Sequence, residues 1–145
     1  MTSRVSKDSR LYIGLMSGTS VDGVDGVLAR LGGGQPPQVL ASASLPMPAG
    51  LRQELLALNQ PGEDELARGA LAANALARLY AQAVAALLQD AAVAAQDVAA
   101  IGAHGQTVRH RPDSGYTVQL NAPALLAELT GIDVVADFRS RDVAA

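Results

Sequence analysis

Short apolar runs separated by turn residues fill the first third of the chain. Residues 11–16 form one run, which stops at a cluster of serine, glycine, threonine and aspartate residues. Apolar positions resume over 24–31, stop at three glycines and two prolines, and alternate weakly over 38–45. Runs of this length between turn residues are typical of β-strands. They predict a three-stranded meander whose first loop, residues 17–23, is the tip of a hairpin.

The middle of the chain has the period of an α-helix. We expect a short helix over residues 51–58 and a longer one from about 63 to 90, whose apolar residues recur at three- and four-residue steps. Acidic residues open the longer helix and suit the positive end of its dipole. Polar residues interrupt it, so we do not expect a membrane-spanning helix, which needs about 18 or more apolar residues.

The last third of the chain returns to strands. The expected elements are strands at 98–103, 116–120 and 132–136 and a helix at 123–130. The order βββ, α, β, β, α, β predicts an α/β protein in which helices cover a mixed sheet. We expect one lobe over residues 11–145, preceded by a flexible tail at residues 1–10, which are polar and lack the apolar centre of a signal peptide.

Composition excludes several classes of function. Eleven lysine and arginine residues against 14 aspartate and glutamate residues give a net charge of −3 without a basic cluster, which argues against a nucleic-acid-binding surface. The chain has no cysteine, so it has neither a disulfide framework nor a thiolate metal site. Together with the polar N-terminus, these features predict a cytoplasmic protein.

The strongest candidate for chemistry is the loop at residues 17–25, which reads Ser-Gly-Thr-Ser-Val-Asp-Gly-Val-Asp. Gly18 and Gly23 lack a Cβ, so their backbone amides can approach an anion closely. The threonine and serine hydroxyls between them can donate to phosphate oxygens. Asp22 would repel a phosphate but can hold Mg²⁺ through water, and the metal then neutralises a nucleotide. From residue types alone, an ordinary polar hairpin explains the loop equally well.

A second candidate follows the strand predicted at 98–103. His104, Gln106 and Thr107 can each hydrogen-bond a sugar hydroxyl, and α/β proteins place ligands at the ends of such strands. A histidine satisfied within the fold is an equally good explanation. His110 is close in sequence, but no third residue has a spacing suited to a metal site.

A third candidate is the charged segment 137–142. Arg139 can clamp a carboxylate or a phosphate with two hydrogen bonds. The alternative, slightly favoured by the residue types, is a cluster of arginine–aspartate ion pairs that shapes the loop.

At these residues the chain resembles the anhydro-N-acetylmuramic acid kinases of bacterial cell-wall recycling. The matching blocks run in order along nearly the whole chain and are residues 14–25, 45–50, 101–109 and 123–145. The resemblance implies a ribonuclease H-like mixed sheet flanked by helices, the N-terminal lobe of an actin/hexokinase-like ATPase fold. It also implies a reaction in which ATP, water and 1,6-anhydro-N-acetylmuramic acid give N-acetylmuramic acid 6-phosphate and ADP, catalysed by a homodimer.

The resemblance implies roles for individual residues as well. The implied ATP-binding residues are Ser17, Gly18, Thr19, Ser20, Val21, Asp22, Gly23 and Val24. The residues implied on the sugar side of the cleft are His104, Gln106, Thr107 and Arg139. The catalytic aspartate of the family, which activates the water, lies beyond residue 145, so we expect no catalytic residue in this chain.

Two departures from the family pattern matter. Family members are more than twice as long, which predicts that this chain is an incomplete kinase without turnover of its own. The alternatives are a stand-alone nucleotide- or sugar-binding module and a truncated product with an exposed apolar face. After Gln119 the family reads Ile-Gly-Asn-Pro, whereas this chain has Leu120-Asn121-Ala122-Pro123, which can alter a sugar contact or the turn into the next helix.

Overall fold

Strands and helices alternate along residues 8–145, which are the residues described by the computed structural model. The strands are β1 (Arg10–Ser17), β2 (Gly23–Leu31), β3 (Gln38–Pro46), β4 (Val98–Ala103), β5 (Gln106–Arg111), β6 (Tyr116–Leu120) and β7 (Val134–Val135). The helices are α1 (Ala49–Ala57), α2 (Glu65–Ala91), α3 (Pro123–Thr130) and α4 (Ser140–Ala144), with 3-10 turns at Ala95–Asp97 and Pro112–Ser114. Of the predicted tail, residues 1–7 lie outside the described residues, and Arg10 already belongs to β1.

Five strands form the main sheet in the order β3-β2-β1-β4-β7. β1 pairs antiparallel with β2, and β2 pairs antiparallel with β3, which confirms the predicted meander. β4 lies parallel to β1, and β7 lies parallel to β4. An antiparallel meander continued by parallel strands is the mixed α/β sheet expected for the N-terminal lobe of an actin/hexokinase-like ATPase.

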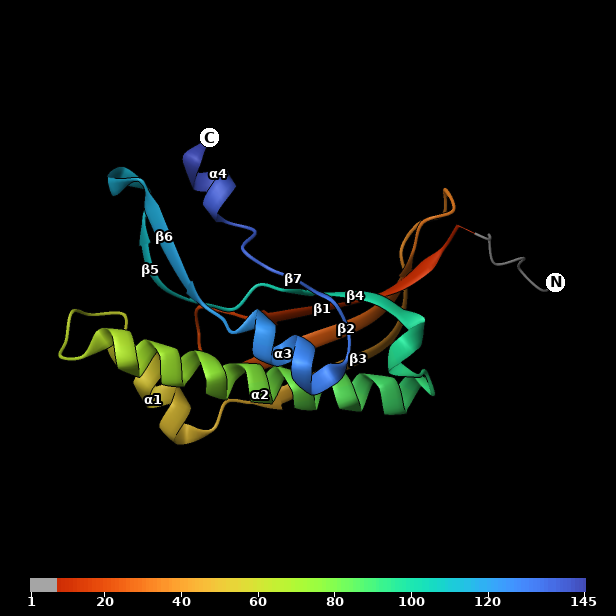
Figure 1. The fold of residues 1–145 in the computed structure, drawn as a ribbon, viewed down its shortest axis with the longest axis horizontal. Coiled ribbons are helices and arrows are strands. Elements are labelled where there is room, and N and C mark those ends of the chain that lie inside the picture. The colour runs from red at the N-terminus through yellow and green to blue at the C-terminus, as the bar shows by residue number, and fades with distance from the viewer. Residues whose placement is uncertain (1–7) are drawn as a thin grey trace.

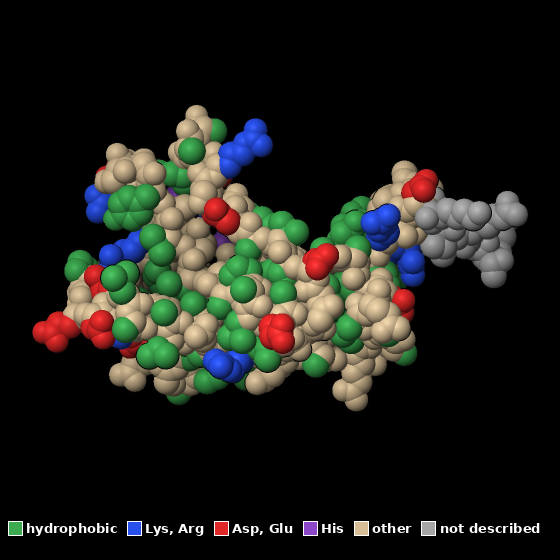
Figure 2. Space-filling view, in the orientation of Figure 1, with side chains coloured by type: hydrophobic (Ala, Val, Ile, Leu, Met, Phe, Trp, Pro, Cys, Tyr) green, Lys and Arg blue, Asp and Glu red, His purple; other side chains and the backbone are tan. Residues whose placement is uncertain are grey.

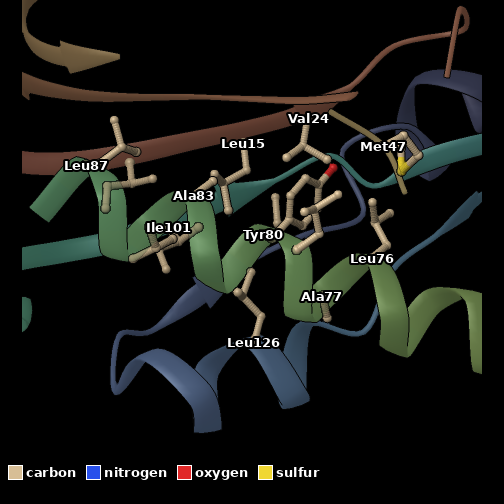
Figure 3. Packing of buried hydrophobic residues seen from close by; sticks show 14 of the residues in the cluster. Leu15, Val24, Met47, Leu76, Ala77, Tyr80, Ala83, Leu87, Ile101 and Leu126 are labelled. Atoms are coloured by element: carbon tan, nitrogen blue, oxygen red, sulfur yellow. The ribbon is translucent and has the colours of Figure 1, made fainter. Parts of the chain in front are cut away.

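One face of this sheet is covered by helices. In Figure 1, α1, α2 and α3 lie on the same side of the sheet, and α2 runs along it. Alternate strand residues point to that side and are buried, among them Leu15 of β1 and Val24 of β2. Figure 3 shows Leu76, Tyr80, Ala83 and Leu87 of α2 on the side of the strands, whereas Ala77 lies on the side that faces α3. The apolar stripe predicted for the long helix is therefore part of the core from Ala73 onward, whereas its first members, Leu66 and Ala70, are exposed.

Helix α2 is, by length and composition, apolar enough to cross a membrane, and among the described residues it is the one helix that is. Half of its most apolar window is buried within the protein. Tyr80, near its middle, is fully buried, and burial raises the pKa of its hydroxyl, while the nearby Gly105 backbone lowers it by less. That hydroxyl has no hydrogen-bond partner of good geometry within the described residues. The many buried residues of α2 make it the central helix of the core.

The β5–β6 hairpin forms a second sheet of two strands. In Figure 1 the hairpin and α4 rise on the side of the main sheet opposite to α1, α2 and α3. The sequence predicts β6 but not β5, because Gln106–Arg111 mixes apolar with charged residues in a way that resembles a loop. The remaining differences are smaller: β7 is shorter than the predicted strand at 132–136, and α4 is an addition to the predicted elements.

Candidate functional site

The three candidate loops meet at one edge of the main sheet. Because β1, β4 and β7 are parallel, their carboxyl ends at Ser17, Ala103 and Val135 lie at the same edge. The β1–β2 loop, the connection from β4 to β5 and the segment after β7 all begin there (Figure 1). Ligands of open α/β sheets bind at this edge. The fold thus brings together motifs that are more than 100 residues apart in the chain.

The β1–β2 loop is held in one shape by its own backbone and by the core. The Val21 N–H donates to the Gly18 carbonyl at 3.1 Å, and the Met47 N–H donates to the Asp22 carbonyl at 2.9 Å. Val21 has a φ of 55°, a conformation that is rare for a β-branched residue and costs about 1–3 kcal/mol. Its side chain is only 1% exposed, so burial of apolar surface opposes that cost.

The two glycines of this loop have different surroundings. A Cβ on Gly18 would meet nothing within 4 Å, so the backbone there faces open space that a ligand can occupy. A Cβ on Gly23 would overlap the carbonyl oxygen of Leu45 in β3, the strand that pairs with β2. Strand pairing therefore explains Gly23, and only Gly18 has the open surroundings that close approach of an anion requires.

Acidic and hydroxyl groups line a hollow of about 370 Å³ beside this loop. The polar side chains in its lining are Ser20, Asp22, Asp25 and Ser44. Ser44 donates to Asp25 at 2.5 Å. The Asp22 carboxylate is 76% exposed and lies 3.7 Å from the guanidinium of Arg52 in α1. Asp25 is exposed as well, so a solvated metal ion can reach both acids of this loop, and Asp22 is the one that accepts no hydrogen bond from Ser44.

A divalent metal at this loop would need further oxygen ligands from a nucleotide. Within residues 8–145, no three histidine, cysteine, aspartate or glutamate side chains gather closely enough to hold a metal on their own. Mg²⁺ is usually bound by one or two carboxylates together with waters and substrate phosphates. The exposed carboxylates of Asp22 and Asp25 beside open backbone fit that pattern.

The second candidate segment turns sharply from β4 into β5. The His104 N–H donates to the Leu15 carbonyl at 3.1 Å, and its half-buried ring places Nδ1 3.1 Å from the Gly105 carbonyl oxygen. Gly105 has a φ of 81°, and a Cβ there would overlap the Leu120 carbonyl oxygen. The fold itself therefore requires the glycine in this segment.

Gln106 and Thr107 face different neighbours, although they are adjacent in the predicted site. The Gln106 side chain is 1% exposed and hydrogen-bonds Ser17 and the Gly18 carbonyl of the first loop. Thr107 is half-buried, and its hydroxyl accepts a hydrogen bond from Gln119 of β6 at 3.1 Å. One residue thus contacts the glycine-rich loop and the other contacts the β5–β6 hairpin.

A polar hollow of about 290 Å³ lies between the hairpin and the start of α4. The polar residues in its lining are His104, Thr117, Gln119, Asn121, Asp137 and Ser140. Asn121 Nδ2 donates to the Ala103 carbonyl at 2.9 Å, and Asn121 Oδ1 has no hydrogen-bond partner within residues 8–145. Sequence reasoning singled out Asn121 as a departure from the family pattern but missed Thr117 and Gln119, because alternation in a short strand does not say which polar side faces a ligand.

The third candidate segment makes contacts at the protein surface. Arg139 Nε lies 3.3 Å from a carboxylate oxygen of Asp142, and Ser140 donates to Asp137 at 2.5 Å. Asp137 has a φ of 62°. Asp137 and Ser140 line the polar hollow, whereas the contact observed for Arg139 is the arginine–aspartate pair of the alternative interpretation.

An apolar hollow of about 410 Å³ lies over the face of the sheet that carries no helix. Its lining includes Gly14, Met16, Val27, Gly102 and Phe138. It shares Asp25 with the hollow at the glycine-rich loop and His104 with the polar hollow. Figure 2 shows the surface recessed here, between α4 and the far end of β1 and β2. The three hollows are therefore neighbours on one side of the molecule.

Known proteins match the chain over almost all of its length. Residues 10–145 match the family model described as Anhydro-N-acetylmuramic acid kinase. A protein of that name from Bordetella petrii is 75% identical over 142 residues, which cover 98% of this chain and 38% of the relative. Its namesakes from Bordetella pertussis and Cupriavidus metallidurans are 74% and 64% identical, over 98% and 96% of this chain. The chain spans 37% of the length of each of these two.

The family match covers all three candidate loops, because it runs from the start of β1 to the last residue of the chain. It also agrees with the observed mixed sheet and with the helices on one of its faces. The chain belongs to the anhydro-N-acetylmuramic acid kinase family.

Proposed function

We propose that this chain forms the nucleotide-binding side of an ATP-dependent kinase that opens 1,6-anhydro-N-acetylmuramic acid and phosphorylates its O6. The observation that carries the proposal is the β1–β2 loop, where open backbone at Gly18 and the exposed carboxylate of Asp22 lie at the carboxyl edge of the sheet. Family membership supplies the reaction. The proposal includes action in the cytoplasm and assembly of the whole kinase as a homodimer.

The loop would bind the phosphates of ATP. Backbone N–H groups beside Gly18 and the hydroxyls of the exposed Thr19 and Ser20 would donate to phosphate oxygens. Asp22 would hold Mg²⁺ through water, which fits its exposure and the absence of a closed metal cage within residues 8–145. When bound, the metal supplies positive charge that neutralises the transferring phosphoryl group.

The polar hollow beside the β5–β6 hairpin would bind the sugar. Side chains such as His104 and Gln119 can exchange hydrogen bonds with hydroxyl and N-acetyl groups. Thr107, which is bonded to Gln119, and Arg139, which follows Asp137, would complete these contacts.

The reaction needs a base that we place outside this chain. Water attacks the anomeric carbon of the anhydro sugar, the bond from that carbon to O6 breaks, and O6 takes the γ-phosphoryl group of ATP, which leaves as ADP. The base would accept the proton of the water. The length of the relatives supports its placement, because the matched segment is only 38% of the Bordetella petrii kinase. The second candidate function is a nucleotide-binding module without turnover, which the β1–β2 loop on its own supports.

A chimeric enzyme separates the two candidates. The matching 142-residue segment of the Bordetella petrii kinase is replaced by this chain, and the chimera is incubated with Mg-ATP and the anhydro sugar. We expect ATP-dependent formation of N-acetylmuramic acid 6-phosphate by the chimera, whereas the 145-residue chain alone binds Mg-ATP in calorimetry without turnover. A folded chimera that forms no phosphorylated sugar contradicts the kinase proposal. Turnover by the chain alone contradicts the placement of the base.

A further inference from the structure

Two polar side chains are buried among residues 8–145, and they are bonded to each other. Ser17, at the end of β1, is 2% exposed, and Gln106, at the start of β5, is 1% exposed. The Ser17 hydroxyl donates to Gln106 Oε1 across a separation of 89 residues. Burial of an amide is costly unless its groups are hydrogen-bonded, so this pair fixes the contact between the two strands.

The other end of the Gln106 amide is also engaged. Gln106 Nε2 donates to the Gly18 carbonyl at 3.1 Å and to the Thr107 carbonyl at 3.3 Å. A glutamine amide has two N–H donors, and both are accounted for by these acceptors. The side chain therefore has no free donor for a sugar hydroxyl, although it lies in the segment predicted to contact the sugar.

The bond to Gly18 sets the direction of the next peptide group. The Gly18 carbonyl accepts from both Gln106 Nε2 and the Val21 N–H, so it points toward the interior. In a planar trans peptide the C=O and the following N–H point in opposite directions. The Thr19 N–H is consequently directed away from the interior, at the place where Gly18 borders open space, and it has no acceptor within the described residues.

We infer that Gln106 is a positioning residue of the nucleotide loop, which holds the Gly18 carbonyl inward so that the Thr19 N–H faces a phosphate oxygen of the nucleotide. The inference rests on the proposed function for the identity of the anion. It assigns Gln106 to the nucleotide side of the site, whereas its neighbour Thr107 belongs to the hairpin that would bind the sugar.

The test compares kinetic constants in the chimera described above. Gln106→Leu keeps much of the volume but removes the three hydrogen bonds, and we expect KM for ATP to rise about tenfold while KM for the anhydro sugar changes less than twofold. Ser17→Ala should act in the same direction, and the double variant should be no worse than Gln106→Leu alone. Gln119→Leu, the matched change on β6, should raise KM for the anhydro sugar and leave KM for ATP nearly unchanged. A rise in the sugar KM alone for Gln106→Leu overturns the inference.

A binding measurement keeps this inference separate from the proposed function. The 145-residue chain is titrated with Mg²⁺ and a non-hydrolysable ATP analogue while its backbone amide resonances are followed. We expect a large shift of the Thr19 amide in the unchanged chain and a shift at least threefold smaller at the same ligand concentration in Ser17→Ala. No shift at Thr19 in the unchanged chain overturns the inference. A shift at Thr19 together with a chimera that does not phosphorylate the sugar counts against the proposed reaction only.

Discussion

The glycine-rich loop and the charged segment 137–142 follow strands that end at the same edge of the sheet, but the two are held by different forces. Both contain a residue other than glycine with positive φ, Val21 at 55° and Asp137 at 62°. Val21 is buried in the core, and the loop around it is bonded to the buried Gln106. The second segment is held by exposed polar contacts among its own residues.

This difference shows which half of the site is preorganised by the chain itself. Breaking buried apolar contacts and buried hydrogen bonds costs more free energy than breaking exposed ion pairs, because water replaces exposed polar contacts at little cost. The β1–β2 loop should therefore keep its shape without a ligand. The segment after β7 should adjust its shape when a ligand or another part of the protein packs on it.

The largest expected effect is on the free energy of unfolding, and it distinguishes the two glycines of the β1–β2 loop. Gly23→Ala should lower the free energy of unfolding by about 3 kcal/mol or more, because the new Cβ overlaps the Leu45 carbonyl oxygen in the paired strand. Gly18→Ala is the matched control and should change it by less than about 1 kcal/mol, since its Cβ meets open space. Urea denaturation of both variants measures this, and equal losses would refute the distinction between the two glycines.

The next effect concerns Asp22, one of the exposed acids of the loop. Asp22→Ala in the chimera should lower kcat by about 100-fold through misplacement of Mg²⁺, with little change in KM for the sugar. Asp113→Ala, in the exposed turn of the β5–β6 hairpin, is the control of similar exposure and should leave kcat within twofold. An unchanged kcat for Asp22→Ala would rule out its role at the metal.

A smaller effect tests the anchor of the loop. Val21→Ala should cost about 2 kcal/mol of stability, from two buried methyl groups and the space they leave. Val135→Ala, on the exposed side of β7, should cost less than about 0.5 kcal/mol. Thermal denaturation can compare the two variants. Similar values would mean that the loop is not anchored through Val21.

The smallest effect is expected in the second segment. Arg139→Ala removes an exposed pair with Asp142 and should change the free energy of unfolding by less than about 0.5 kcal/mol. The sugar KM of the chimera is the second readout, and it should rise if Arg139 turns from Asp142 to the ligand. A loss of stability above about 2 kcal/mol would show that this segment is as firmly anchored as the first.

The same contrast explains what the sequence could predict. Turn residues and the 3.6-residue period identified the meander, α2, α3 and the hairpin tip at residues 17–23, because these signals are local. The burial of Gln106 depends on Ser17, 89 residues away, and a polar residue beside a glycine gives no local sign of it. Gly23 likewise owes its role to a carbonyl in β3, which becomes visible only when the strands are paired.

The central claim is that the β1–β2 loop receives the phosphates of a metal-bound nucleotide. A crystal structure of this chain with Mg²⁺ and a non-hydrolysable ATP analogue tests it most directly. We expect phosphate density against the backbone at Gly18 and Thr19, and the metal joined to Asp22 through water. An empty loop in a crystal that holds the nucleotide elsewhere on the molecule would contradict the account.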